Sequence, residues 1–293
     1  MNILIYGGNG WIGQQICEYL KNKNINYVCG TARCDNYELL YNEILNIKPS
    51  HVISLIGRTH GKIDDKIYST IDYLEESGKL VENINDNLYS PLLLAIITNK
   101  LNIHFTYIGT GCIFEYDSNH LFGEEKNGFN ENDKPNFYGS SYSIVKGYTD
   151  RIMHLYNNVL NLRIRMPITN INNPRNFITK IITYDKICSI PNSMTVLPNL
   201  IPVMIDLMLQ LRTGTVNFAN HGLISHNEIL ELYKEIIDPT FTWKNFTMEE
   251  QNKILSSKRS NNYLDTDLLK ELSPDVLHIK EAVRWCLQNW KNT

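Results

Sequence analysis

Tyr142 and Lys146 are the first pair of side chains whose spacing suggests catalysis. Residues four apart share a helix face and stand about one turn from each other. A lysine ammonium at that distance favours the phenolate form of a tyrosine, which prepares the phenol for proton transfer, and it can also hold a ribose hydroxyl. Surface pairs show the same spacing by chance, so the rest of the chain has to decide between these two interpretations.

A glycine-rich turn at the N-terminus provides the second chemical signal. Its glycines follow an apolar run at G-x-x-G-x-x-G spacing: Gly7, Gly10 and Gly13. The first lets the chain reverse, the second lets the backbone approach a pyrophosphate, and the third lets a helix pack closely on the strand. The helix N-terminus offers unpaired N–H groups and a positive dipole end to phosphates. A tight turn can use glycine for steric reasons alone, but a position directly after a buried-type strand favours a nucleotide. The nucleotide-binding residues expected in this turn are Gly7, Asn9, Gly10, Trp11, Ile12 and Gly13.

The elements that must position these residues alternate between strand-like and helical patterns through the first half of the chain. Such alternation is typical of a parallel sheet covered by helices on both faces. After the opening apolar run, the expected strands are Ile25–Gly30, His51–Gly57, Ile103–Gly109, Asn161–Met166 and Thr215–Ala219. After the helix that follows the glycine turn, the clearest helices are expected at 79–99, from about Ser141, at Glu228–Ile237 and at Ile279–Trp290.

The carboxyl ends of these strands are where a ligand is expected, because open α/β sheets bind ligands just outside that edge. Gly7, Gly57 and Thr110 would then line one crevice. Gly57 would let the backbone pass close to a cofactor. Asn87, in the long helix, is a further expected cofactor contact.

The length and composition of the chain set broad limits on its class. Its 293 residues, 43% of them hydrophobic, can form one large domain or two unequal lobes. We expect a dinucleotide-binding domain over 1–166, completed by a strand near 215–220, and a smaller, mainly substrate-binding lobe over 167–293. The formal charge of −3 argues against nucleic acids and anionic membranes as partners. The most apolar region, 196–211, contains two prolines and an aspartate and is too short to span a bilayer.

Cysteine usage and the start of the chain indicate the compartment. The six cysteines form no C-x-x-C pair and no dense framework, which suits a reducing compartment. A strand begins at once, which leaves no room for a signal peptide. We therefore expect a cytoplasmic protein, and the sequence suggests no metal site.

The glycine turn and the Tyr142/Lys146 pair together resemble the extended short-chain dehydrogenase/reductase superfamily. The resemblance implies a Rossmann-type doubly wound parallel sheet with a smaller C-terminal substrate lobe. In that superfamily a Ser or Thr beyond the fourth strand completes a catalytic triad, and Thr110 occupies this place. Tyr142 and Lys146 would then also contact the cofactor.

The residues after Thr110 indicate the reaction within that superfamily. Its nucleotide-sugar dehydratases carry an Asp-Glu pair there, whereas this chain has Gly111 and Cys112, so water elimination is disfavoured. A thiol at this place is similar to that of GDP-fucose synthase, where it exchanges protons at carbons beside a ketone. A buried structural cysteine is the alternative.

Longer segments resemble one family, the bifunctional UDP-4-keto-6-deoxy-glucose 3,5-epimerase/4-reductases of UDP-L-rhamnose synthesis, known from plants and giant viruses. The segments that carry the resemblance are Thr110–Asp117, Lys134–Phe137, Leu162–Pro167, Asn173–Lys180, Ile190–Thr195 and Ser225–Ile229. The resemblance runs from the first residue to about Tyr233, and the last sixty or so residues are less distinctive.

The resemblance implies a mechanism for five side chains. A ketone at C4 acidifies the hydrogens at C3 and C5, and Cys112 and Lys180 would remove and return those protons on opposite faces. Thr110 and Tyr142 would hydrogen-bond the O4 oxyanion. A nicotinamide would then deliver hydride to C4 while Tyr142, assisted by Lys146, protonates O4. A surface or phosphate-binding role is the alternative for Lys180.

Substrate and cofactor contacts follow from the same resemblance. Arg175 and Asn176 would touch the nucleotide sugar, although Arg175 could serve a structural ion pair, and Met194 and Thr195 would border the uridine or pack in the core. For the cofactor, an NAD enzyme places an acid roughly twenty residues past the glycine turn. Here Arg33 offers a cation, with Asp35 shortly after, so NADPH is favoured and NADH is less likely.

Two other functions remain open at this point. One is a reductase without epimerase activity, resembling dTDP-4-dehydrorhamnose reductase. The other is a non-catalytic regulatory subunit of the same fold, like the β subunit of methionine adenosyltransferase. Members of the superfamily often dimerise through two helices, here near 79–99 and 141–157, so a homodimer is expected.

Overall fold

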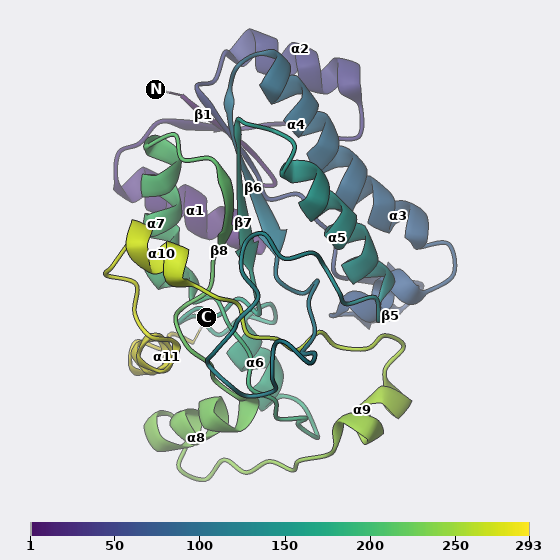
Figure 1. The fold of residues 1–293 in the computed structure, drawn as a ribbon, viewed down its shortest axis with the longest axis vertical. Helices are drawn as coiled ribbons and strands as arrows, with labels where there is room; N and C mark the ends of the chain where they lie inside the picture. The colour runs from purple at the N-terminus through teal and green to yellow at the C-terminus, as the bar shows by residue number, and fades with distance from the viewer. Residues whose placement is uncertain (1, 293) are drawn as a thin grey trace. The chain divides into compact units, whose positions relative to one another are not determined.

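A computed structural model describes residues 2–292 (Figure 1). These residues fall into two compact units. The first unit comprises the chain up to Thr110, Ser140–Arg163 and Ile201–Val216. The second comprises Gly111–Gly139, Ile164–Leu200 and the chain from Asn217 onward. The expected domain boundary after residue 166 stays a prediction, because each compact unit consists of several separate segments of the chain.

A six-stranded sheet forms the centre of the first unit. Its strands are β1 (Ile3–Tyr6), β2 (Tyr27–Cys29), β3 (His51–Ser54), β6 (His104–Thr110), β7 (Val159–Ile164) and β8 (Gly214–Asn217), in the order β2-β1-β3-β6-β7-β8. Strand β1 pairs in parallel with β2 and β3, and β3 with β6. The chain therefore winds outward in both directions from β1 and β3, which makes their carboxyl ends the topological switch point. This arrangement confirms the predicted Rossmann-type doubly wound sheet.

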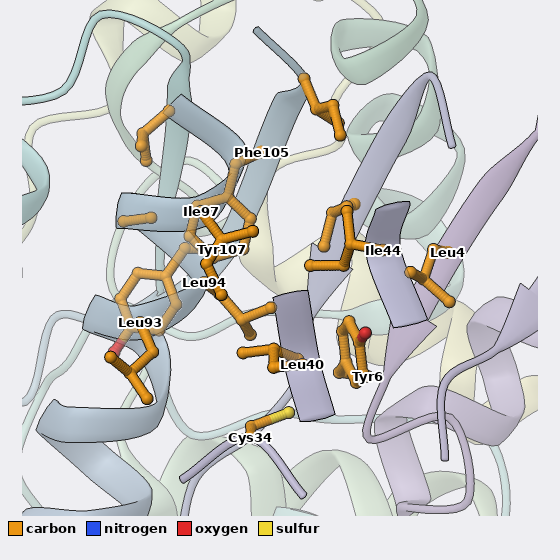
Figure 2. Packing of buried hydrophobic residues seen from close by; sticks show 14 of the residues in the cluster. Leu4, Tyr6, Cys34, Leu40, Ile44, Leu93, Leu94, Ile97, Phe105 and Tyr107 are labelled. Atoms are coloured by element: carbon orange, nitrogen blue, oxygen red, sulfur yellow. The ribbon is translucent and has the colours of Figure 1, made fainter. Parts of the chain in front are cut away.

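Helices cover both faces of this sheet. They are α1 (Trp11–Asn22), α2 (Tyr37–Ile47), α3 (Leu80–Ile84), α4 (Ser90–Lys100), α5 (Ser141–Met153) and α7 (Leu197–Leu209). Figure 1 shows α1 and α7 on one face and α2, α4 and α5 on the other. On the latter face, apolar side chains of α2 and α4 meet those of β1 and β6 (Figure 2). The labelled members of this cluster are Leu4, Tyr6, Cys34, Leu40, Ile44, Leu93, Leu94, Ile97, Phe105 and Tyr107.

The long helix expected at 79–99 is present, with one irregularity. A π-helical turn, Asn85–Tyr89, joins α3 to α4. Pro91 has no backbone N–H, so the carbonyl of Asn87 cannot receive the usual hydrogen bond from four residues ahead. The hydroxyl of Thr149 on α5 donates to that carbonyl instead, at 2.6 Å. A contact with a neighbouring helix thus supports the turn.

Three features of the fold were not predicted from the sequence: helix α2, helix α7 and a short hairpin with the turn that follows it. Helix α2 begins after Asn36, whose side chain accepts a hydrogen bond from the Leu39 amide. Helix α7 forms in the apolar region 196–211, and Pro202 lies inside it. A short antiparallel hairpin consists of β4 (Gly61–Ile63) and β5 (Lys66–Tyr68), followed by a 3₁₀ turn at Ile71–Glu75. Among the described residues, no helix combines the length and apolarity needed to cross a bilayer.

The second unit is mainly helical. It contains α6 (Phe177–Ile182), α8 (His226–Ile236), α9 (Met248–Ile254), α10 (Asp267–Leu272) and α11 (Ile279–Gln288). The helices expected at Glu228–Ile237 and Ile279–Trp290 are confirmed with small shifts of their ends. Ser225 and Glu228 form a capping box at the start of α8, which explains its early beginning. The apolar faces of α6, α8 and α11 share one core.

His226 in this core makes the stability of the protein sensitive to acid. Burial lowers the pKa of His226 to about 4, and its Nδ1 is buried without a hydrogen-bond partner among the described residues. An unfolded histidine titrates near pH ~6.5. Below that pH the unfolded chain binds a proton that the folded chain excludes, so stability that is present above ~6.5 is lost as the pH falls towards 4. Between pH 7.5 and pH 4.5 we expect a loss of about 2 kcal/mol rather than the full value of the shift, because this interval ends before the folded histidine is fully titrated.

Urea unfolding at pH 7.5 and pH 4.5 checks this prediction. His226→Gln should lose less stability than the wild type over that interval, since glutamine does not titrate. Burial also lowers the pKa of His51 and His104, so some acid sensitivity persists in the variant. Equal losses in the two proteins would assign the acid sensitivity to other groups.

Candidate active site

The glycine turn of the first unit leaves no room for side chains. Gly7 has φ of +84°, a left-handed value that favours glycine, and a Cβ there would lie 3.0 Å from the Leu55 carbonyl carbon. A Cβ on Gly13 would lie 2.3 Å from the Gly7 carbonyl oxygen. Gly10 precedes α1 and supplies no side-chain cap, so the first N–H groups of the helix remain available to an anion. The turn therefore fits the diphosphate of a dinucleotide. Of the other residues expected there, Asn9 is exposed, and Trp11 and Ile12 are half-buried at the start of α1.

The segment after β3 reaches the same edge of the sheet and is held by Asn87. The Leu55 amide donates to the Tyr6 carbonyl at 2.9 Å, which keeps the ends of β1 and β3 together. The Asn87 side chain is buried; it accepts from the Arg58 amide at 3.0 Å and donates to the Arg58 carbonyl at 2.9 Å. A Cβ on Gly57 would lie 3.1 Å from Asn87 Oδ1. Asn87 therefore positions this segment, and its contact with a cofactor stays a prediction.

Two charged residues stand beyond the end of β2. Arg33 is 77% exposed, and its Nη2 lies 2.6 Å from Asp35 Oδ2. Glu43 of α2, which sequence reasoning missed, accepts from the amide of Thr31 at 2.8 Å and from its hydroxyl at 2.6 Å. Burial alone would raise the pKa of Glu43, but these hydrogen bonds outweigh burial and lower it. The Glu43 carboxylate thus fixes the loop that presents Arg33 to solvent.

The expected triad lies on β6 and α5. Thr110 is the last residue of β6, and α5 carries Tyr142 and Lys146, all three buried. Lys146 Nζ donates to the Tyr107 hydroxyl and, at 3.4 Å, to the Ile108 carbonyl. Burial raises the pKa of Tyr107 far above its usual value, so this phenol stays neutral. Tyr107 was missed from the sequence, because its contact with Lys146 depends on the packing of α5 against β6.

Helix α5 is fixed to β7 by a buried ion pair. Arg163 Nη2 lies 2.8 Å from Asp150 Oδ2, and Asn161 donates to the same carboxylate at 2.8 Å. Burial alone would raise the pKa of Asp150, but the hydrogen bonds, led by that of Arg163, hold it well below its usual range. Asp150 lies one turn after Lys146, so the ion pair fixes the position of the ammonium.

Cys112 belongs to the second unit, is half-buried and forms no disulfide with another described residue. The peptide before it is tightly held: the Gly111 carbonyl accepts from Arg165 Nη1 at 3.2 Å and from Asn262 Nδ2 at 2.9 Å. The Phe114 carbonyl accepts from the Ser260 hydroxyl at 2.6 Å. Cys112 is thus a partly exposed residue on a tightly hydrogen-bonded backbone, unlike the buried Cys188 and Cys286.

Lys180 lies on α6 close to two other cations. Burial, together with the charges of Arg175 and Arg259, lowers the pKa of Lys180 to about 8. A lysine with this pKa exists in both protonation states near neutral pH, as a group that both takes and gives protons requires. Arg259 was missed because it belongs to the less distinctive C-terminal part of the sequence. Its Nη1 donates to the Ser257 carbonyl at 3.0 Å.

Three of the expected substrate contacts are buried in the structure. The Asn176 side chain is 0% exposed; it accepts from the Ile178 amide and donates to the Thr169 carbonyl at 2.8 Å, so it caps α6. Thr195 donates to a backbone carbonyl at 2.7 Å, and Met194 packs in the core. Asn176 thus positions the start of the helix that carries Lys180. The contact of all three residues with a nucleotide sugar stays a prediction, as does that of the half-buried Arg175.

Comparison with known proteins identifies relatives over the full chain. The model of the NAD dependent epimerase/dehydratase family matches residues 3–184. Protein L780 of Acanthamoeba polyphaga mimivirus is 56% identical over 292 residues, 99% of both chains. Its crystal structure, described as that of a UDP-rhamnose synthase, has a TM-score of 0.94 at 55% identity and covers 99% of both chains.

Plant and bacterial proteins extend these similarities. A bifunctional dTDP-4-dehydrorhamnose 3,5-epimerase/dTDP-4-dehydrorhamnose reductase from Arabidopsis thaliana is 44% identical over 96% of this chain and 91% of its own. A dTDP-4-dehydrorhamnose reductase from Clostridium acetobutylicum shares the fold, with a TM-score of 0.76 at 22% identity over 98% of both chains.

Proposed function

The chain belongs to the NAD dependent epimerase/dehydratase family, and from this premise we propose that it converts UDP-4-keto-6-deoxy-D-glucose to UDP-L-rhamnose. It is an enzyme with two activities, epimerisation at C3 and C5 and reduction of the C4 ketone with NADPH. The observation that carries this proposal is the similarity, over 99% of both chains, to a UDP-rhamnose synthase. The cofactor-binding domain over 1–166 and the mainly substrate-binding lobe over 167–293 are parts of the same proposal.

Epimerisation is assigned to Cys112 and Lys180. The C4 ketone acidifies the neighbouring C–H bonds; one side chain accepts the proton and the other returns a proton to the opposite face. The lowered pKa of Lys180 supports this role, because at pH 8 about half of the amines are neutral and able to accept a proton. Thr110 and Tyr142 donate hydrogen bonds to O4 while negative charge develops there.

Reduction is assigned to the residues of the first unit. The fit of the glycine turn to a diphosphate and the uncapped start of α1 support dinucleotide binding there. A bound nicotinamide supplies hydride to C4. Tyr142 gives its proton to O4, and Lys146, held by Tyr107, keeps a positive charge beside that phenol. The exposed Arg33 supports NADPH over NADH, since its guanidinium is accessible to a 2′-phosphate.

Product analysis by NMR tests the proposal. With UDP-4-keto-6-deoxy-glucose and NADPH, UDP-L-rhamnose should form. In deuterated water without NADPH, deuterium should enter C3 and C5 of the keto sugar. Reduction without exchange would indicate a reductase that depends on a separate epimerase. If neither occurs, a non-catalytic subunit is the better description.

The pH dependence of exchange provides a test of Lys180. Only the neutral amine accepts a proton, so exchange at the carbon that Lys180 deprotonates should rise as the pH increases through about 8, the pKa of this lysine. Lys180→Arg should abolish that inflection, because arginine stays protonated. Lys186→Arg, at an exposed lysine of the same segment, should keep it. An unchanged profile in Lys180→Arg would remove Lys180 from the proton transfer.

We also propose a cytoplasmic homodimer. Helices α3, α4 and α5 expose apolar side chains, which supports pairing through these helices: Leu80, Val81, Ile84, Ile96, Ile144 and Tyr148. Sedimentation should give twice the chain mass of 34.0 kDa for the wild type. The Val81→Asp/Tyr148→Asp double variant should sediment as a monomer. A wild type that sediments as a monomer would exclude the dimer.

A further inference from the structure

Arg165 in the second unit is a buried cation that forms no ion pair with a carboxylate in the described part of the chain. Arg165 is 1% exposed, and the charged groups that act on its pKa within residues 2–292 include no Asp or Glu. Nη2 donates to Asn192 Oδ1 at 2.8 Å and to the Ser260 carbonyl at 3.0 Å, and Nη1 donates to the Gly111 carbonyl at 3.2 Å. Nε is buried and has no hydrogen-bond partner in the described part of the chain. All these acceptors are neutral.

Such an arrangement costs free energy unless the charge has a further use. Removing an ion from water without a counter-charge costs roughly several kcal/mol, even after the protein relaxes around it. An arginine cannot avoid this cost by losing its proton. Burial lowers the pKa of Arg165, and the two acidic side chains that act against this effect are Cys112 and Tyr116. A negative charge on either group would compensate the guanidinium.

Tyr116 is poorly suited to carry that negative charge. Burial raises the pKa of Tyr116 to about 12, and its hydroxyl donates to the Pro191 carbonyl at 2.9 Å. A phenol that donates a hydrogen bond and titrates this high stays neutral near pH 7. Cys112 remains as the group whose ionised form Arg165 can stabilise.

Contacts with the backbone place Arg165 beside the peptide that leads into Cys112. The guanidinium donates to the carbonyl of Gly111, the residue before Cys112. A Cβ on Gly111 would lie 3.0 Å from Arg165 Cγ and 2.7 Å from Leu264 Cδ1, so the arginine stem packs against this peptide. Asn262 donates to the same carbonyl and completes the support.

We propose that Arg165 is a positioning residue that holds the Cys112 peptide in place and stabilises the thiolate that exchanges protons with the sugar. This inference rests on the proposed epimerase function. In the step concerned, the thiolate sulfur forms an S–H bond with the proton at the sugar carbon. The C–H electron pair moves into the enolate that ends at O4, and Arg165 stays protonated throughout.

Alkylation of Cys112 by iodoacetamide at pH 7 tests the charge effect without substrate, because the thiolate is the reactive form. In the full-length protein, Arg165→Met should slow alkylation of Cys112 about tenfold. Mass spectrometry of the peptide that contains Cys112 measures this rate. Arg165→Lys keeps the charge and should recover most of the rate. Arg284→Met removes an exposed cation that pairs with Glu235, and it should leave the rate unchanged.

Asn192→Asp gives a second route if Arg165→Met does not fold. The substitution has nearly the same shape and supplies the missing counter-charge 2.8 Å from Nη2. It should therefore also slow alkylation several-fold, about as expected for partial neutralisation of a nearby charge. An unchanged or faster reaction in the folded variants would overturn the proposal.

Measuring two activities separately distinguishes a failure of this inference from a failure of the proposed function. Arg165→Met should lower deuterium exchange at C3 and C5 while reduction of the already epimerised UDP-4-keto-L-rhamnose stays within a few-fold of wild type. Equal loss of both activities would mean a merely structural role for Arg165. A wild type that exchanges no deuterium would overturn the epimerase function, and the alkylation rates would still decide whether Arg165 stabilises the thiolate.

Discussion

Tyr142→Phe should slow reduction of the C4 ketone by about 10²–10⁴-fold, the range expected when a positioned general acid is removed. The substitution takes away only the hydroxyl that gives its proton to O4. The buried aromatic ring at position 142 of α5 remains, and Lys146 keeps its hydrogen bond to Tyr107. The helix should therefore be undisturbed. Stopped-flow oxidation of NADPH with UDP-4-keto-L-rhamnose would measure the loss in kcat.

Tyr148→Phe is the matched control for this prediction. Tyr148 lies on the same helix, but its side chain is exposed, so its hydroxyl should not matter for reduction. NADPH affinity, measured by fluorescence titration, should change little in either variant. If Tyr142→Phe reduces the ketone within threefold of wild type, the proton comes from another group.

Cys112→Ala should separate the two activities. Without the thiol, one of the two proton-transfer groups is missing, and deuterium exchange at C3 and C5 should fall at least about 100-fold. Reduction of UDP-4-keto-L-rhamnose should persist within a few-fold, because hydride transfer and protonation of O4 depend on Tyr142 and Lys146. NMR without NADPH and NADPH oxidation with the epimerised substrate measure the two activities separately.

Cys188→Ala controls for the loss of a thiol as such. Cys188 lies in the same unit as Cys112 but is buried, so the Cys188→Ala variant should retain both activities. Should Cys112→Ala keep full exchange, Cys112 would have no part in proton transfer and the enzyme would use another group. Should it lose reduction as strongly as exchange, the side chain would be needed for substrate binding in general.

The parts of the site that could be predicted from the sequence depend on local chain geometry. A glycine turn after a buried strand and a Tyr/Lys pair one helical turn apart need only their own neighbours to define their shape. Both therefore appear as expected, at the start of α1 and on α5. The parallel sheet with helices on both faces was predicted from the alternation of elements, since few other folds accommodate that alternation.

The parts that could not be predicted depend on partners far along the chain. The hydrogen bonds of Arg165 reach Ser260, 95 residues later, and the Lys146–Tyr107 contact spans 39 residues. The π-helical turn needs a hydroxyl from Thr149. Spacing in the sequence contains no signal for such pairings.

Because of the π-helical turn, the number of residues between α3 and α4 determines how these two helices are oriented relative to each other. Relative to a regular α-helix, a π turn accommodates one extra residue. Loss of a single residue there would give a smoother helix, yet it would rotate the two flanking halves by about 100° relative to each other. Asn87 would then face away from Arg58, although no contacting side chain had been substituted. An insertion or deletion at this point therefore changes the relative orientation of the flanking helices as well as the length of the segment.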